Sequence, residues 1–137
     1  MTWLLLALLP YFVRPDPAKT PGAVLTRKSS DVCTLGWAGA HRNVPYGVRH
    51  QVMSAYGVPH EKWKNYELDH LISLELGGSN DPRNLWPQRY PQAYSKDSLE
   101  NALHRAVCSN RLPLDSAQRW IAHNWVSAYR AMKRRRL

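Results

Sequence analysis

The sequence predicts a small α+β domain in which short strands precede two helices. Its length of 137 residues suits one domain with a modest core. Two short apolar segments, at residues 67–72 and about 74–76, are closed by a glycine pair and a polar loop, which is typical of a hairpin. Apolar residues then recur at helical spacing over about residues 95–108, and again after Pro113.

The beginning of the chain has the composition of a leader followed by a linker. Residues 3–9 form an apolar run much shorter than the ~20 residues that span a bilayer, so no membrane span is expected. The run resembles the apolar part of a secretory signal, although no Lys or Arg precedes it. We expect residues 1–19 to be leader and linker, residues 20–137 to form the domain, and the protein to be exported, either periplasmic or extracellular. The alternatives are a truncated start or a buried apolar arm in a cytoplasmic protein.

Three helices are expected between these ends. One covers about residues 47–56 and ends at Gly57, in a region that we interpret as packing scaffold. The next carries the stripe Leu99, Leu103 and Val107, which must face the core. The last is expected to begin with Asp115 or Ser116 as its N-cap. Its apolar positions are Trp120, Trp125, Ala128 and Tyr129.

The chain has two cysteines, Cys33 and Cys108. In an oxidising compartment they have one pairing, and a bridge would contribute roughly 3 to 5 kcal/mol by closing a long loop. In a reducing compartment they would be small buried apolar side chains. Two cysteines cannot supply the four thiolates of a zinc ribbon.

The chain is strongly basic, with a formal net charge of +9 and a pI near 9.9. This charge suits a polyanionic partner such as nucleic acid. Proteins that bind membrane surfaces, and soluble proteins whose charge serves only solubility, can also be basic. Lys133 and the three arginines after it either bind phosphate or stabilise the end of the last helix through its dipole.

The segment YELDHLISLELGGSNDPRNLWPQ, at residues 66–88, places Asp69 and His70 together in a strand. A histidine with an ordinary pKa near 6.5 can take a proton from water near neutral pH. A carboxylate beside it can hold a divalent cation that neutralises charge in the transition state. Because strand neighbours point to opposite faces, one side chain can bind metal while the other faces substrate.

The motif DHLISLELGG followed by NLWPQ resembles the HNH, or His-Me finger, endonucleases, and the similarity continues into SKDSLENALHRAVC. The resemblance implies a ββα-metal core at about residues 66–108, with His70 as general base and Asp69 as metal ligand. It also implies that Asn84 orients the imidazole, and a turn cap is the alternative role for this residue. Gly77 and Gly78 would let the hairpin turn tightly.

The sequence departs from zinc-braced members of this family, because no histidine follows NLWPQ soon afterwards. Glu100 and His104 lie one helical turn apart, so we expect them to complete the metal site with Asp69, and Asp97 is the alternative ligand. An ordinary surface pair of Lys96 and Glu100 would also explain these residues. The implied cofactor is one divalent ion, with Mg²⁺ favoured and Mn²⁺, Zn²⁺ or Ni²⁺ also compatible with Asp, Glu and His ligands.

The cations that flank the motif are expected to seat the phosphates of the substrate. They are Arg83, Arg89, Lys96 and Arg105. No helix-turn-helix or finger motif is present to read bases, so low sequence specificity is expected. We predict a metal-dependent endonuclease acting on nucleic acid, with DNA favoured over RNA. The alternatives are a basic nucleic-acid-binding module without catalysis and an exported structural or interaction protein, and the sequence leaves the oligomeric state open.

Overall fold

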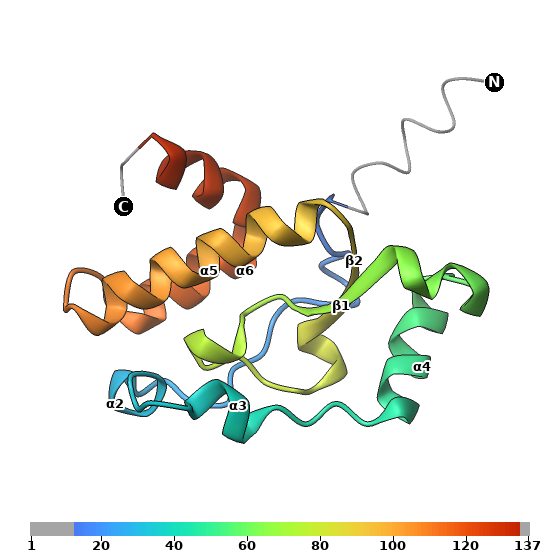
Figure 1. Cartoon of the computed structure of the whole chain (residues 1–137), viewed down its shortest axis with the longest axis horizontal. Helices are drawn as coiled ribbons and strands as arrows, with labels where there is room; N and C mark the ends of the chain where they lie inside the picture. The colour runs from blue at the N-terminus through green and yellow to red at the C-terminus, as the bar shows by residue number, and fades with distance from the viewer. Residues whose placement is uncertain (1–12, 135–137) are drawn as a thin grey trace.

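The structure is a computed structural model that describes residues 13–134 (Figure 1). Residues 1–12 of the predicted leader and linker, which was expected to cover residues 1–19, lie outside this range. In chain order, the elements are α2 (Ser29–Val32), α3 (Trp37–His41), α4 (Tyr46–Ala55), the 3₁₀ helix η1 (His60–Asn65), β1 (Tyr66–His70), the 3₁₀ helices η2 (Leu74–Leu76) and η3 (Pro82–Asn84), β2 (Leu85–Arg89), α5 (Gln92–Cys108) and α6 (Leu114–Lys133).

The strands β1 and β2 form a two-stranded antiparallel hairpin, which packs against helices. This confirms the predicted class, a small α+β domain with a long C-terminal helix. The predicted second strand is wrong, because residues 74–76 form η2 and the NLWPQ segment supplies β2 instead. Pro87 argues against a strand in the sequence, since it has no N–H to donate. In a two-stranded hairpin, however, each strand has an outer edge where that N–H is not needed.

The loop between the strands folds closely on itself. Gly77 has a φ of +81°, and a Cβ on Gly78 would overlap the carbonyl oxygen of Ile72. Glycine is therefore required here by the left-handed backbone and by the close approach of two chain segments. The pair does not form the tight hairpin turn that the sequence indicated, because the loop continues to Asn84 before β2 begins.

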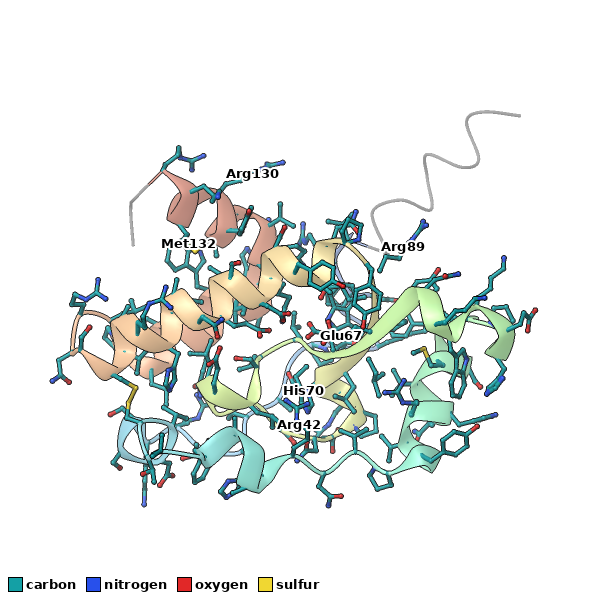
Figure 2. The ribbon with its side chains drawn as sticks, in the orientation of Figure 1. Arg42, Glu67, His70, Arg89, Arg130 and Met132 are labelled. Atoms are coloured by element: carbon teal, nitrogen blue, oxygen red, sulfur yellow. A yellow bond between two sulfur atoms is a disulfide. The ribbon has the colours of Figure 1, made fainter. Side chains whose placement is uncertain are left out.

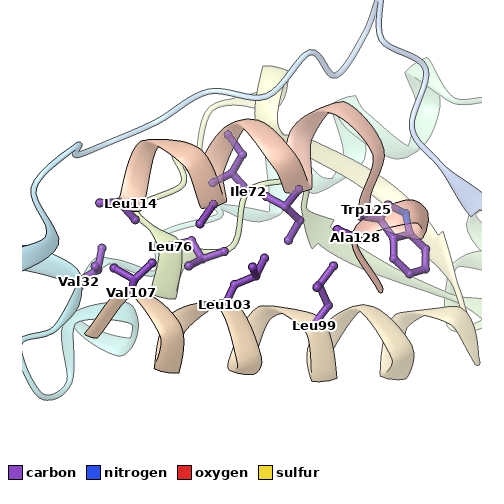
Figure 3. Close-up of a cluster of buried hydrophobic side chains, with 11 residues drawn as sticks. Val32, Ile72, Leu76, Leu99, Leu103, Val107, Leu114, Trp125 and Ala128 are labelled. Carbon is purple, nitrogen blue, oxygen red and sulfur yellow. The ribbon is translucent and has the colours of Figure 1, made fainter. Parts of the chain in front are cut away.

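The core lies mainly between α5 and α6, with Ile72 and Leu76 of the interstrand loop placed between the helices (Figure 3). The predicted stripe on α5 is confirmed, since Leu99, Leu103 and Val107 are all buried. The other fully buried members are Val32, Leu114, Ala117, Ile121, Trp125 and Ala128, while Trp120 and Tyr129 pack against them with part of their surface exposed.

The N-cap of α6 lies two residues before the first of the two predicted caps. Pro113 is its N-cap, and the Asp115 side chain lies inside the first turn, where it pairs with Arg119 at 2.8 Å. The helix changes direction at Asn124, and next to that kink the indole of Trp125 donates to the carbonyl oxygen of Val13 at 2.7 Å. The proline-rich segment that follows Val13 therefore starts from a point fixed to α6.

The predicted pairing of Cys33 with Cys108 is confirmed by a disulfide with an S–S distance of 2.06 Å. It joins the residue after α2 to the last residue of α5. Disulfides are typical of oxidising compartments. Within residues 13–134, no helix is long and apolar enough to cross a membrane.

Replacing both cysteines by serine should lower the free energy of unfolding by roughly 4 kcal/mol, since the bridge closes a loop with a sequence separation of 75 residues. Urea denaturation of the oxidised wild type and the Cys33→Ser/Cys108→Ser variant measures this difference. Wild-type protein in excess reductant is the matched control and should unfold like the double variant. Equal denaturation midpoints for oxidised and reduced protein would contradict the expectation.

Candidate functional site

A cluster of buried charged side chains lies where the end of β1 meets α5. Asp69 and His70 end the strand and are only 7% and 6% exposed, and Glu100 on α5 is 9% exposed. Lys96, one turn before Glu100, is completely buried. Charged side chains are rarely buried unless they are paired, so the pairing of this cluster defines what it can do.

The ammonium group of Lys96 is the centre of the cluster. Its nitrogen lies 2.7 Å from Oδ2 of Asp69 and 2.6 Å from Oε1 of Glu100. It also donates to the backbone carbonyl of His70 at 2.8 Å. Burial alone would lower the pKa of Lys96, but the two carboxylates outweigh burial and raise it. The lysine is therefore a charged structural group that fixes α5 to the end of β1.

This position of Lys96 corrects two predictions. The side chain cannot seat a substrate phosphate, because it has no exposed surface. Its ammonium also occupies the place between Asp69 and Glu100 that a shared metal ion would need. The pair with Glu100 does exist, but it is a buried interaction rather than a solvated surface pair.

His104, the third predicted metal ligand, lies elsewhere. Its Nε2 is 2.9 Å from the carbonyl oxygen of Val32 and 3.5 Å from the sulfur of Cys108. One further turn along α5 thus brings the imidazole under α2 and away from β1. The set of Asp69, Glu100 and His104 does not converge, and no three His, Cys, Asp or Glu side chains within residues 13–134 are arranged to hold a metal ion.

The imidazole of His70 is held by Asn80, a residue that the sequence analysis missed. Oδ1 of Asn80 lies 3.0 Å from Nε2 of His70. The amide nitrogen of Asn80 donates to the carbonyl of His41 at 2.7 Å, and Oδ1 accepts from the backbone N–H of Asn43 at 3.2 Å. Because Oδ1 is thereby fixed as an acceptor, Nε2 must carry the proton. Nδ1 is then the unprotonated nitrogen, as a general base requires.

Asn84 does not orient the imidazole, so that predicted contact is wrong. Its amide is fully buried and bonds to the backbone of the interstrand loop. Oδ1 accepts from the N–H of Ile72 at 3.0 Å, and Nδ2 donates to the carbonyls of Ile72 at 2.9 Å and Ser79 at 2.8 Å. Asn84 therefore fixes the loop that carries Asn80, and it acts on His70 only through that loop.

A second missed residue, Arg42, lies beside His70 (Figure 2). It follows α3 directly and is exposed. Burial lowers the pKa of His70, and the positive charges of Arg42 and Lys96 lower it further. The hydrogen bond that the ring donates to Asn80 and the charge of Asp69 act in the opposite direction. The ring is thus kept neutral next to an accessible guanidinium. A basic residue in a loop gave no sequence signal that could separate Arg42 from other surface arginines.

Two further carboxylates border the cluster, Glu67 on β1 and Asp97 on α5. Burial raises the pKa of Glu67 to about 7, and the negative charges of Asp69 and Asp97 contribute. Burial and the charge of Asp69 also raise the pKa of Asp97. Lys96 acts electrostatically on both carboxylates, but its direct contacts are with Asp69 and Glu100. Carboxyl groups therefore outnumber cations around Lys96.

The remaining predicted phosphate-binding residues are exposed. Arg83 forms an ion pair with Asp81 at 3.0 Å in the interstrand loop. Arg89 is the last residue of β2, and Arg105 lies on the solvent side of α5. The guanidinium groups of these three arginines therefore lie at the surface on three different elements. They do not form one cluster.

Comparison of the chain with protein-family models, curated proteins and solved structures found no match. The chemistry of the site is therefore interpreted from its own residues. These are a neutral imidazole of fixed tautomer, a nearby guanidinium and a group of carboxylates next to a buried lysine.

The different roles of Asn84 and Asn80 can be tested by stability. Asn84→Ala leaves several buried backbone groups without partners, at ~1–3 kcal/mol for each unsatisfied group, so we expect a loss of roughly 2–4 kcal/mol. Asn80→Ala removes a half-buried side chain and should cost about 1 kcal/mol. Urea denaturation measures both variants. An Asn84→Ala protein as stable as the wild type would show that the loop does not depend on this amide.

Proposed function

We propose that this protein is a nuclease that hydrolyses phosphodiester bonds with His70 as its general base. The observation that carries the proposal is the fixed tautomer of His70, whose Nε2–H is held by Asn80 while Nδ1 remains able to accept a proton. A positioned neutral imidazole can take a proton from water near neutral pH. The guanidinium of Arg42 beside it has the geometry to bind a phosphate through two hydrogen bonds.

The arrangement of the chain supports an HNH-like, ββα core. Two antiparallel strands are joined by a loop and followed by α5, and the Asp69–His70 pair ends the first strand. The buried Lys96 contacts both the side chain of Asp69 and the backbone of His70. In the proposed reaction Asp69 and Lys96 are positioning residues, because they hold the strand end that carries the base.

The proposed chemical step is an attack by water on phosphorus. Nδ1 of His70 takes one proton from the water as its oxygen forms a bond to phosphorus. The bond between phosphorus and the leaving oxygen breaks, and that oxygen takes a proton from solvent. Arg42 would bind a non-bridging phosphate oxygen and stabilise the charge that develops there.

A divalent cation is part of the proposal, although its place differs from the predicted one. Glu67 and Asp97 border the cluster and are close enough for their charges to act on each other, and carboxylate oxygen atoms are ligands that Mg²⁺ prefers. Two carboxylates are enough for Mg²⁺, which commonly completes its shell with water and substrate phosphate. The ion would supply the positive charge that lets a polyanionic substrate approach this negative site.

The substrate proposed is nucleic acid, with DNA favoured and low sequence specificity. The formal charge of +9 supports a polyanionic partner. Export remains a proposal and is supported by the disulfide between Cys33 and Cys108.

His70→Ala should reduce plasmid nicking by ~10² to 10⁴, the usual effect of removing a positioned general base. His60→Ala, which changes an exposed histidine of η1, is the matched control and should nick like the wild type. Because burial lowers the pKa of His70, the wild-type rate at saturating Mg²⁺ should stay on its plateau as the pH falls through 6.5 and decline only below that value. Nicking assays across pH measure both effects.

A His70→Ala protein that keeps its fold and nicks within ~10-fold of the wild type would remove His70 from the mechanism. Nucleic-acid binding by a wild-type protein that cleaves neither DNA nor RNA with any divalent cation would favour a binding module instead.

Chelation should abolish cleavage, and Mg²⁺ should restore it. Glu67→Gln and Asp97→Asn should each raise the Mg²⁺ concentration needed for half-maximal nicking by ~10-fold or more, since each removes a charged ligand. Glu61→Gln, at an exposed position of η1, is the control and should leave this concentration unchanged. Full activity in a chelator would show that the reaction needs no metal ion.

A further inference from the structure

Two tyrosines with exposed rings lie side by side after β2. Tyr90 is 41% exposed and Tyr94 is 63% exposed. Their ring centroids are 5.5 Å apart, and the rings are tilted by 37°. Small domains gain much of their stability by burying aromatic rings, so an exposed neighbouring pair is not explained by packing.

The pair lies next to the candidate site. Tyr90 follows β2 directly, and its N–H bonds to the carbonyl of Asn65 at 3.3 Å. Tyr94 is in the first turn of α5, shortly before Lys96. The Tyr90 phenol is close enough to Glu67 and Asp97 for their charges to act on it. Tyr90 follows Arg89, which pairs with Tyr66 at the start of β1. From Tyr66 to His70 the strand advances four residue steps of ~3.3 Å, or ~13 Å. A short nucleic-acid strand can therefore reach both the tyrosines and His70.

Positive charge accompanies the two rings. Arg89 directly precedes Tyr90, and Arg49 of α4 acts electrostatically on the Tyr90 phenol. Exposed aromatic rings combined with cations are the usual surface for single-stranded nucleic acid, because bases stack on the rings while cations contact the backbone. In a duplex the faces of the bases are covered by their neighbours and cannot stack on protein rings in this way.

We propose that Tyr90 and Tyr94 stack an unpaired nucleobase, so that the protein binds single-stranded nucleic acid in preference to duplex. The proposal deepens the proposed function, because it names the strand state of the substrate that the same site would cut. Tyr94, with the more exposed ring, makes the larger contribution. The stacking itself can be measured without cleavage.

The test is fluorescence anisotropy of a labelled oligonucleotide with Mg²⁺ present, in a His70→Ala background that prevents cleavage, with single-stranded DNA, single-stranded RNA and duplex DNA as separate arms. Tyr94→Ala should weaken single-strand binding by ~5- to 150-fold, which corresponds to ~1–3 kcal/mol per stacked base. Tyr94→Phe keeps the ring and should stay close to the wild type. Duplex binding should change little in either variant, because it depends on phosphate contacts.

Tyr46→Ala is the matched control, since Tyr46 is 65% exposed but lies at the start of α4 and contacts Trp63. An equal loss in this control, or an equal loss for single strand and duplex with Tyr94→Ala, would overturn the proposal. A change of oligomeric state with Tyr94→Ala would also overturn it, since the patch would then be a contact between copies. A wild type that binds single strands through Tyr94 but cleaves nothing would refute the proposed function and leave the stacking supported.

Discussion

The ammonium group of Lys96 is buried between α5 and the end of β1, and the geometry of the site depends on it. It contacts the carboxyl groups of Asp69 and Glu100 and bonds to the backbone of His70 at the same time. Removing one partner from a buried ion pair typically costs 3–5 kcal/mol, because the remaining charge stays uncompensated. The helix α5 and the strand β1 are therefore held in one relative position. The imidazole of His70 and the neighbouring carboxylates are fixed with them.

A second constraint acts on the other side of His70. Asn84 bonds to the backbone of the interstrand loop, and Gly78 allows two segments of that loop to touch. The loop in turn carries Asn80, which selects the protonated nitrogen of His70. His70 is thus positioned by backbone geometry on one side and by a buried charge on the other. Neither arrangement requires an exposed residue, so the exposed surface around His70 is free to vary.

The three longer helices, the α5 core stripe and the disulfide were predictable from the sequence for specific reasons, whereas the short helices α2 and α3 were not expected. The stripe follows from local spacing, and two cysteines leave one intramolecular pairing. Asn84 was recognised as important but was given the wrong partner, because spacing along the chain does not show which atoms a folded loop brings together. His104 shares a helix face with Glu100, yet α2 covers the histidine and β1 approaches the glutamate. Helical periodicity defines a face but does not identify the segment that packs against it.

The disulfide has a consequence for the integrity of the chain. The hairpin, its loop and most of α5 lie between Cys33 and Cys108, so they belong to one covalent ring. A protease that cuts a single peptide bond inside the ring, for example next to the fully exposed Leu35, opens the ring but releases no fragment. The two halves remain joined through sulfur, and the contacts of Lys96 and Asn84 can keep them in register. A protein with this topology can be nicked and still persist as one folded molecule.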